Sequence, residues 1–454
     1  MELTRVSRPA GSRQLFPLKL SVSLLALFLG LVVIPARLGH PFWPFPAMEK
    51  AFAGNLGSRI PDQIVLSWTG SPSSTQAITW RTTTDVEKSV VQYWVMEGRQ
   101  SPSEAGKTTD TQVPPAESST TTGTSAIFQS DLGVMRIHEV NLTGLKPGTR
   151  YAYRVGDGTA DGWSPVYTFV TAVQQPQQVS VLVAGDSQSL PTNYSLWQKV
   201  LQTAVHDETP ENFLVQTGDL VDAGAEEQHW ESWFAAGRGV LEGLPEMPAL
   251  GNHENARGGA GYFTAHFQLP TNGPEGLKEL AYSFDYGDVH WIVLDSEATS
   301  WSAREQQLQW LEADLQAAKD RPWKVVVFHR TPYEVKRWRP NSDLVNFYVP
   351  LFDRYHVDLV LSGHDHSYAR SYPLRQGQVA KATPTDLTQG TVYIVTGRSG
   401  VKTYTDTYQP DWAAAFASGV PQPNYLNLIF SGRTVRIINR YLDGTVTDDV
   451  VLSK

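Results

Sequence analysis

A run of four apolar residues leads directly into a glycine and an aspartate at Val181-Leu-Val-Ala-Gly-Asp186. Apolar runs without alternation are typical of strands that are covered on both faces. Similar runs follow at residues 213–217, 289–294, 325–328 and 357–361. Between two of these runs, residues 303–319 predict an amphipathic helix with Ser302 and Glu305 as its capping box. Its apolar face is expected to consist of Leu308, Leu311 and Leu315. Strands that alternate with a helix in this way predict an α/β layered domain.

Short polar motifs stand where the expected strands end. The residues in these motifs are Asp186, Asp219, Asn252, His253, His329, His364 and His366. Because the carboxyl ends of strands are where open α/β sheets place their ligands, we expect these side chains to converge on one rim. Oxygen and imidazole donors without sulfur suit Zn, Mn, Fe or Co. The sequence therefore predicts a metal site at this rim.

Each motif taken singly has a simpler structural interpretation. A Gly-Asp or an Asn-His pair in a loop is most often a turn. A single histidine at a strand end is more often a hydrogen-bonded structural residue than a ligand. Histidines without an adjacent glycine, which we interpret as structural, are His206, His229, His266, His290 and His356. Because all five motifs occur in order, each at an expected strand end, one shared site is the better interpretation.

Composition narrows the class of protein. Of the 454 residues, 41% are hydrophobic and 11% aromatic, which supports a large core and excludes global disorder. The net charge of −9 argues against a protein whose main task is to bind nucleic-acid phosphates. The absence of cysteine excludes disulfide scaffolds, zinc fingers, iron–sulfur clusters and thiol nucleophiles.

The N-terminus has the pattern of an export signal. Four basic residues precede a predominantly apolar run at residues 20–34, and Pro35 ends the run. This length matches the apolar region of a signal peptide better than the ~20 residues of a membrane span. We expect residues 1–36 to be a signal peptide or a retained N-terminal anchor, and residues 37–59 to be a spacer. The protein is then exported: secreted, periplasmic, or membrane-anchored facing outward, with the membrane contacted only through an uncleaved N-terminal segment.

Residues 60–172 predict an all-β sandwich. Short alternating runs rich in aromatic and β-branched residues lie at 63–68, 77–80, 89–94, 151–155 and 166–170. The Ser- and Thr-rich segment 101–127 is expected to be a loop within this domain. The glutamine-rich segment 173–178 is expected to link it to a second domain, residues 179–454. Because the sandwich holds one histidine, His138, and no cluster of carboxylates, we expect it to have a spacing or supporting role.

The ordered motifs resemble those of the calcineurin-like metallophosphoesterases over residues 177–454. The matching segments are Gly-Asp186, Gly-Asp219-Leu-Val-Asp222, Gly-Asn252-His253-Glu254, His329 and Gly-His364-Asp-His366. The preceding domain is similar to the fibronectin type III-like domain of purple acid phosphatases. Its matching segments begin at Leu142-Thr-Gly-Leu-Lys-Pro-Gly-Thr-Arg-Tyr151 and end at Trp163-Ser-Pro-Val-Tyr-Thr-Phe169. The resemblance implies a two-domain protein whose C-terminal domain is a four-layer α/β/β/α structure.

The resemblance also implies a dinuclear metal centre. Asp219 would bridge two ions, divalent or of mixed valence, with Fe, Zn and Mn as candidates. The further ligands implied are Asp186 and His366 for one ion, and Asn252, His329 and His364 for the other. His253 would contact the phosphate and protonate the leaving group.

Two positions depart from the family patterns. Purple acid phosphatases place a tyrosine three residues after the bridging aspartate, where this chain has Asp222. The broader family places a histidine two residues after the first aspartate, where this chain has Gln188. Gln188, Asp222 or water would complete the first metal site. Without the tyrosinate, we expect the iron-loaded protein to lack the purple charge-transfer band, which a visible spectrum tests.

The sequence therefore predicts hydrolysis of phosphate esters by a hydroxide activated at a dinuclear metal centre. The expected partner is a small phosphorylated substrate, with no nucleic acid as a stable partner. The alternatives are a phosphodiesterase or nucleotidase of the same family, and a degenerate, non-catalytic binding or adhesion protein. A serine hydrolase centred on Gly397-Arg-Ser-Gly400 is disfavoured, because Val401 stands where a nucleophile elbow has its last glycine.

Overall fold

The computed structural model describes residues 54–96, 114–206 and 210–454. The predicted export segment 1–36 and most of the expected spacer lie outside these ranges. Within them, no helix combines the length and the apolar character that crossing a membrane requires.

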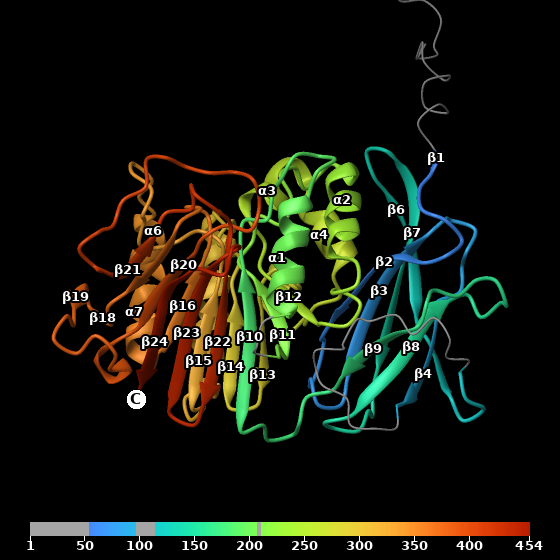
Figure 1. Ribbon diagram of the computed structural model, residues 1–454, viewed down its shortest axis with the longest axis horizontal. Coiled ribbons are helices and arrows are strands. Elements are labelled where there is room, and N and C mark those ends of the chain that lie inside the picture. The colour runs from blue at the N-terminus through green and yellow to red at the C-terminus, as the bar shows by residue number, and fades with distance from the viewer. Residues whose placement is uncertain (1–53, 97–113, 207–209) are drawn as a thin grey trace, which may run out of the picture. The chain divides into compact units, whose positions relative to one another are not determined.

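The first domain is a β-sandwich, as the alternating runs predicted. One sheet has the order β1-β7-β3-β2, with β6 paired to β7, and the other has the order β5-β4-β8-β9 (Figure 1). The strands are β1 (Gly54–Asn55), β2 (Asp62–Ser67), β3 (Gln76–Thr82), β4 (Val90–Val95), β5 (Ser119–Thr122), β6 (Thr124–Gln129), β7 (Gly133–Leu142), β8 (Arg150–Gly156) and β9 (Tyr167–Val170). Side chains from both sheets, among them Trp80 and Tyr153, share one buried cluster. The hydroxyl of Tyr151 accepts a hydrogen bond from the backbone N–H of Lys146 at 2.9 Å.

The prediction of a loop over 101–127 is wrong from residue 119 on, and residues 101–113 lie outside the described ranges. Residues 119–122 form β5 and residues 124–129 form β6, both at sheet edges. Threonine is β-branched and fits a pleated surface, so a Ser- and Thr-rich segment can form a strand without an apolar face. Most side chains in these two strands are exposed, which is why the segment shows no buried alternation.

The second domain holds two larger sheets. The six-stranded sheet consists, in order, of β12 (Glu246–Pro248), β11 (Phe213–Gln216), β10 (Gln178–Ala184), β22 (Asn424–Ser431), β23 (Thr434–Tyr441) and β24 (Val446–Ser453). The seven-stranded sheet consists, in order, of β13 (Tyr282–Tyr286), β14 (Val289–Val293), β15 (Trp323–Val327), β16 (Leu359–Ser362), β20 (Val392–Thr396), β17 (Tyr368–Ser371) and β21 (Ala413–Ala417). A small hairpin is formed by β18 (Leu374–Arg375) and β19 (Gln378–Val379). Strands β10, β11 and β12 are parallel, as are β14, β15, β16 and β20.

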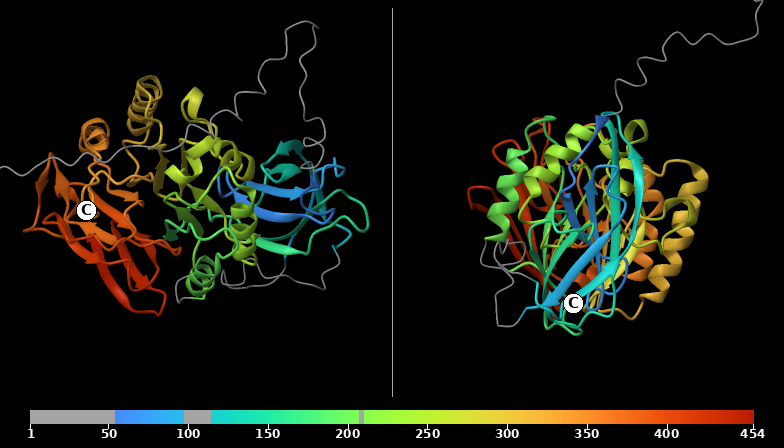
Figure 2. Two further views of the ribbon diagram at one scale, coloured as in Figure 1. Left: turned by 90° about the horizontal axis from the view of Figure 1, so that it is seen from above. Right: turned by 90° about the vertical axis from the view of Figure 1, so that its right-hand side faces the viewer.

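Helices cover the outer faces of both sheets, which gives the predicted α/β/β/α order (Figures 1 and 2). The helices are α1 (Ser195–Val205), α2 (Glu227–Gly237), α3 (Asn252–Asn255), α4 (Ala260–His266), α5 (Trp301–Ala317), α6 (Ser342–Phe347) and α7 (Val349–Tyr355), with short 3₁₀ turns η2 (Ala256–Gly258), η3 (Glu275–Leu277) and η4 (Leu387–Gln389). In β14, Trp291 faces the core between the sheets, whereas Ile292 faces the cluster that holds Leu311 of α5. Burial on both faces explains the continuous apolar runs.

Helix α5 begins earlier than the sequence predicted. It starts at Trp301, and the Ser300 side chain accepts a hydrogen bond from the N–H of Ala303 at 3.3 Å. The predicted capping box of Ser302 and Glu305 is therefore wrong, because Ser302 lies inside the first turn. The predicted apolar face is correct: Leu311 and Leu315 are buried, and Leu308 packs against the same cluster.

The sandwich and the second domain share part of one core. Trp68, directly after β2, packs edge-on against Phe213 of β11, with ring centroids 5.4 Å apart. Arg81 of β3 forms ion pairs with the buried Glu227 and the partly exposed Glu231 of α2. The tyrosine hydroxyl of Tyr153 donates to a backbone carbonyl of the second domain at 2.7 Å. Apolar packing and charge pairing therefore both join the domains.

Candidate metal centre

The ends of five strands bring the predicted polar residues to one rim. Asp186, Asp219 and Asn252 follow β10, β11 and β12 of the six-stranded sheet, whereas His329 follows β15 of the seven-stranded sheet. His364 and His366 follow β16 of the same sheet. The six side chains therefore come from both sheets, and they meet where the carboxyl ends of the two sheets approach each other.

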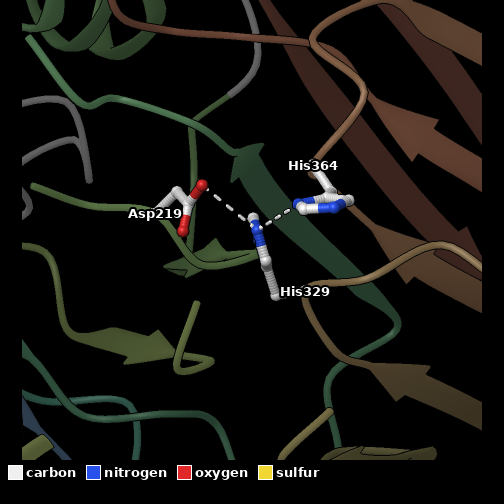
Figure 3. A group of neighbouring side chains, drawn as sticks. All are labelled: Asp219, His329 and His364. Atoms are coloured by element: carbon white, nitrogen blue, oxygen red, sulfur yellow. Dashed lines mark hydrogen bonds and ion pairs between the residues drawn. The ribbon is translucent and has the colours of Figure 1, made fainter. Parts of the chain in front are cut away.

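Asp219, His329 and His364 form one group of ligand atoms, all within 4.8 Å of one another. Figure 3 shows His329 between the other two side chains. Its Nε2 lies 3.2 Å from Asp219 Oδ2 and 3.0 Å from His364 Nδ1. The side-chain oxygen of Asn252 lies 3.2 Å from the same Nε2. Together with Asn252, this group comprises the four residues that the resemblance implied for one ion.

Asp186, Asp219 and His366 form a second group within the same distance limit. His366 Nε2 lies 3.1 Å from Asp186 Oδ1. Both Asp186 oxygens also accept the backbone N–H of His364 at 3.0 Å. Asp219 belongs to both groups, so its carboxylate lies where a ligand bridging two ions must lie.

The hydrogen bonds of two histidines show that these groups fit metal ions. Nδ1 of His329 contacts the carbonyl of Thr217 at 2.9 Å, and Nδ1 of His366 contacts the carbonyl of Lys402 at 2.8 Å. A carbonyl oxygen can only accept, so each Nδ1 carries a hydrogen, and each Nε2, when it holds no proton, presents a lone pair. Both lone pairs face carboxylate oxygens. Lone pairs that face one another require a proton or a metal ion between them, and imidazole with carboxylate is a donor set that suits Zn, Mn and Fe.

The pKa values of Asp219 and His329 also show that this site favours a positive charge beside the carboxylate. Burial alone would raise the pKa of Asp219, but the charge and hydrogen bond of His329 outweigh burial and lower it below its usual value. Burial opposes protonation of His329, yet Asp219 raises the pKa of His329 to about 10. A proton on His329 thus supplies the charge that a divalent ion would supply in its place.

The backbone at this rim is unusual. Asp186, Asp219, His364 and His366 have φ values of 52°, 53°, 74° and 54°, in the left-handed region that non-glycine residues seldom adopt. Residues with such strained backbone angles are common at functional sites, where the surrounding structure stabilises them. Gly218 has φ 90°, and a Cβ there would lie 2.8 Å from the Cβ of His329. Only glycine leaves room for the end of β11, which carries Asp219, to approach His329.

Comparisons with known proteins agree with this geometry. A family model described as calcineurin-like phosphoesterase matches residues 179–368, and one described as the purple acid phosphatase N-terminal domain matches residues 61–171. This chain thus carries a calcineurin-like phosphoesterase domain at residues 179–368. Its first domain is of the purple acid phosphatase type. The structure of a purple acid phosphatase from yellow lupin seeds is similar in fold, with a TM-score of 0.67 at 18% identity over 87% of this chain and 74% of that chain.

Four curated relatives differ in how much of this chain they match and in the activity that their names state. Human acid phosphatase type 7 is 28% identical over 87% of this chain and 92% of its own length. An uncharacterized protein of Mycobacterium tuberculosis is 32% identical over 64% of this chain, and the match spans only 61% of that protein's length. Two Arabidopsis thaliana relatives, at 26% identity, carry the name probable inactive purple acid phosphatase.

Gln188 and Asp222, the two departures from the family patterns, lie in different places. Nε2 of Gln188 lies 3.0 Å from Asp219 Oδ2 and 3.3 Å from His366 Nε2, inside the second group. Its buried Oε1 has no hydrogen-bond partner within the described ranges. A half-turn of the amide would direct this oxygen toward the same position. The carboxylate of Asp222 instead lies 3.4 Å from His253 Nδ1, with 47% of its side chain exposed.

Replacing Gln188 with alanine should weaken the binding of one metal ion by about 10- to 100-fold, because an amide donor would be lost from a buried position. The other ion should bind as before. Titration of metal-free protein with Zn²⁺ or Mn²⁺ measures both affinities. Ser189→Ala, a substitution at a neighbouring buried residue whose hydroxyl donates to the carbonyl of Ser187, is the control. If Gln188→Ala binds both metal ions with unchanged affinity, a donor other than Gln188 completes the site of Asp186, Asp219 and His366.

Two further residues support this phosphoesterase centre and were not singled out from the sequence. Glu254 is fully buried, and its carboxylate accepts the backbone N–H groups of Asp219, Gly251 and Val221, each at 2.9 Å. A glutamate three residues after Gly251, at the start of a helix, is half of a capping box and would have predicted the bond to the Gly251 N–H, but not the bonds to Asp219 and Val221. Lys402 places its Nζ 2.8 Å from Nε2 of His253. No sequence signal points to it.

Proposed function

We propose that this chain hydrolyses phosphate esters at a dinuclear metal centre. The observation that carries the proposal is the pair of buried ligand groups that share Asp219. With two divalent ions bound, and with the charges of Asp186 and Asp219 subtracted, the centre would keep about two positive charges. That charge suits an anionic phosphate ester. The ions would supply Lewis acidity toward the ester oxygens and a hydroxide nucleophile near neutral pH.

The residues of the chain have separate tasks in this reaction. The six ligands hold the ions, and the carbonyls of Thr217 and Lys402 fix the rings of His329 and His366 with Nε2 directed inward. His253 lies at the edge of the centre, with Nε2 3.8 Å from Asp219 Oδ2. Its ring is therefore within reach of an ester bound to the ions. We assign it contact with the phosphate and, when a proton occupies its Nε2 in place of the hydrogen bond from Lys402, assistance to the departing alcohol.

A second candidate function is binding without catalysis. The ligand count favours it, because the group around Asp186 lacks the histidine or tyrosine that related sites place there. The names of two inactive relatives favour it as well. Against it stand the six other ligand residues and His253, and the unpartnered Oε1 of Gln188 at the incomplete position.

Metal analysis of the purified protein, with rates on one aryl phosphomonoester and one aryl phosphodiester, tests the proposal. We expect two ions for each chain, Fe, Zn or Mn, and loss of hydrolysis after treatment with a chelator. His329→Ala should lose most of kcat, because His329 contacts both Asp219 and Asn252. Full activity after chelation, or in His329→Ala, contradicts the proposal. Fewer than two ions together with no hydrolysis favours the binding protein.

A further inference from the structure

An ammonium group faces the one histidine of the site that is not a candidate ligand. Nζ of Lys402 lies 2.8 Å from Nε2 of His253. On the other side of the ring, Nδ1 of His253 contacts the carbonyl of Asp222 at 2.5 Å. Because that carbonyl can only accept, Nδ1 carries the hydrogen and Nε2 accepts a hydrogen bond from Lys402. The ammonium of Lys402 therefore keeps N–H groups that are not used by His253 and can face the metal centre.

The backbone around Lys402 is built into the metal centre. The N–H of Gly400 donates to the carbonyl of Asp186 at 2.9 Å. The carbonyl of Lys402 accepts from Nδ1 of His366 at 2.8 Å. A Cβ at Gly400 would lie 2.2 Å from the carbonyl oxygen of Gln188, so only glycine allows this close approach. The segment of Lys402 is thus hydrogen-bonded to the segments that carry Asp186 and His366, and these bonds fix the position of Lys402.

The other cations around the centre already have partners. Arg330 donates two hydrogen bonds to the carboxylate of Glu297, at 2.6 and 2.9 Å. Arg398 is buried and donates to two backbone carbonyls. Arg339 donates to the carbonyl of His364. Lys402 has no carboxylate partner within the described part of the chain, and its charge is thus free to meet an anion.

We propose that Lys402 is a phosphate-binding residue of this centre and that it favours dianionic phosphate monoesters over monoanionic diesters. This inference rests on the proposed function. An ammonium is a compact charge with three donors, of which one is occupied by His253. The other two can contact the ester oxygens that the metal ions leave exposed. The attraction grows with the charge of the phosphate, so a monoester gains more from Lys402 than a diester does.

The test compares Lys402→Met with the wild type, both loaded with metal. We expect the Kd for inorganic phosphate, measured by calorimetry, to rise about 10- to 100-fold, as for the loss of a hydrogen bond to a charged group. The value of kcat/KM should fall more for the aryl monoester than for the aryl diester. Metal content should stay at the wild-type value. Lys278→Met is the matched control, because Lys278 is exposed and pairs with Glu275, and it should leave phosphate affinity within about twofold.

Two further variants keep the test decisive if the methionine variant folds poorly. Lys402→Arg keeps the charge and should keep most of the phosphate affinity, whereas Lys402→Gln removes the charge and should lose it. Equal phosphate affinity in Lys402→Gln and the wild type, with metal content unchanged, overturns the assignment. Equal losses for the monoester and the diester overturn the preference for monoesters. A wild type that binds two metals and phosphate but hydrolyses neither ester would contradict the proposed function and leave the phosphate-binding role intact.

Discussion

Replacing Asp219 with asparagine should lower kcat for an aryl phosphomonoester by more than about a thousandfold, which corresponds to about 4 kcal/mol of transition-state stabilisation. Asp219 is the only residue in both ligand groups found within the described ranges. Asparagine keeps the shape of the side chain but removes the negative charge that both groups share. One ion should therefore bind far more weakly, and the electrostatic stabilisation that depends on two ions should be lost with it.

The comparison variant for this prediction is Asp222→Asn, three residues further along the chain. The same charge is removed there from a side chain that is 47% exposed and lies beside His253. Elemental analysis and kcat should be measured on both variants. Two ions and near wild-type kcat in Asp219→Asn would refute the bridging role. Loss of an ion in Asp222→Asn would instead place Asp222 among the ligands.

Replacing Glu254 with alanine should lower the free energy of unfolding by about 3 to 6 kcal/mol, because three buried N–H groups would lose their only acceptor. These N–H groups belong to the turns that carry Asp219 and Asn252, so metal binding should fail at the same time. Glu254→Gln keeps one carbonyl oxygen and should have an intermediate effect.

Urea unfolding of the metal-free protein measures the change without a contribution from bound ions. Glu275→Ala is the control, because Glu275 is exposed and pairs only with Lys278. A change below about 1 kcal/mol in Glu254→Ala would mean that water satisfies the three donors, and that the carboxylate has no structural role.

The sequence predicted the parts of the fold in which burial leaves a pattern. Strands β10, β14 and β15 are buried on both faces, and they appear as continuous apolar runs. The candidate ligands follow such strands with a glycine or a short turn, so their convergence could be expected from topology alone. Strands β5 and β6 were missed because exposed edge strands have no buried face to leave a pattern.

The supporting residues of the site were less predictable. Lys402 is a single lysine in a loop, and its role depends on backbone contacts with segments more than two hundred residues earlier in the chain. The sequence of Gly397–Gly400 resembles only an incomplete nucleophile elbow. Ser399 is in fact buried, with its hydroxyl donating to the carbonyl of Asn424, and Gly400 holds the strand end of Asp186. Contacts of this kind come from the tertiary structure, and no local pattern reports them.

The packing of Trp68 against Phe213 constrains how this protein could have changed during evolution. Trp68 also lies against Phe284 and Tyr286, so three aromatic rings of the second domain rely on a side chain supplied by the first. A gene that lost the first domain would expose this apolar surface to water, and the shortened product would be prone to aggregate. Loss or exchange of the first domain therefore requires simultaneous polar substitutions at these rings, which makes the two domains an inherited unit.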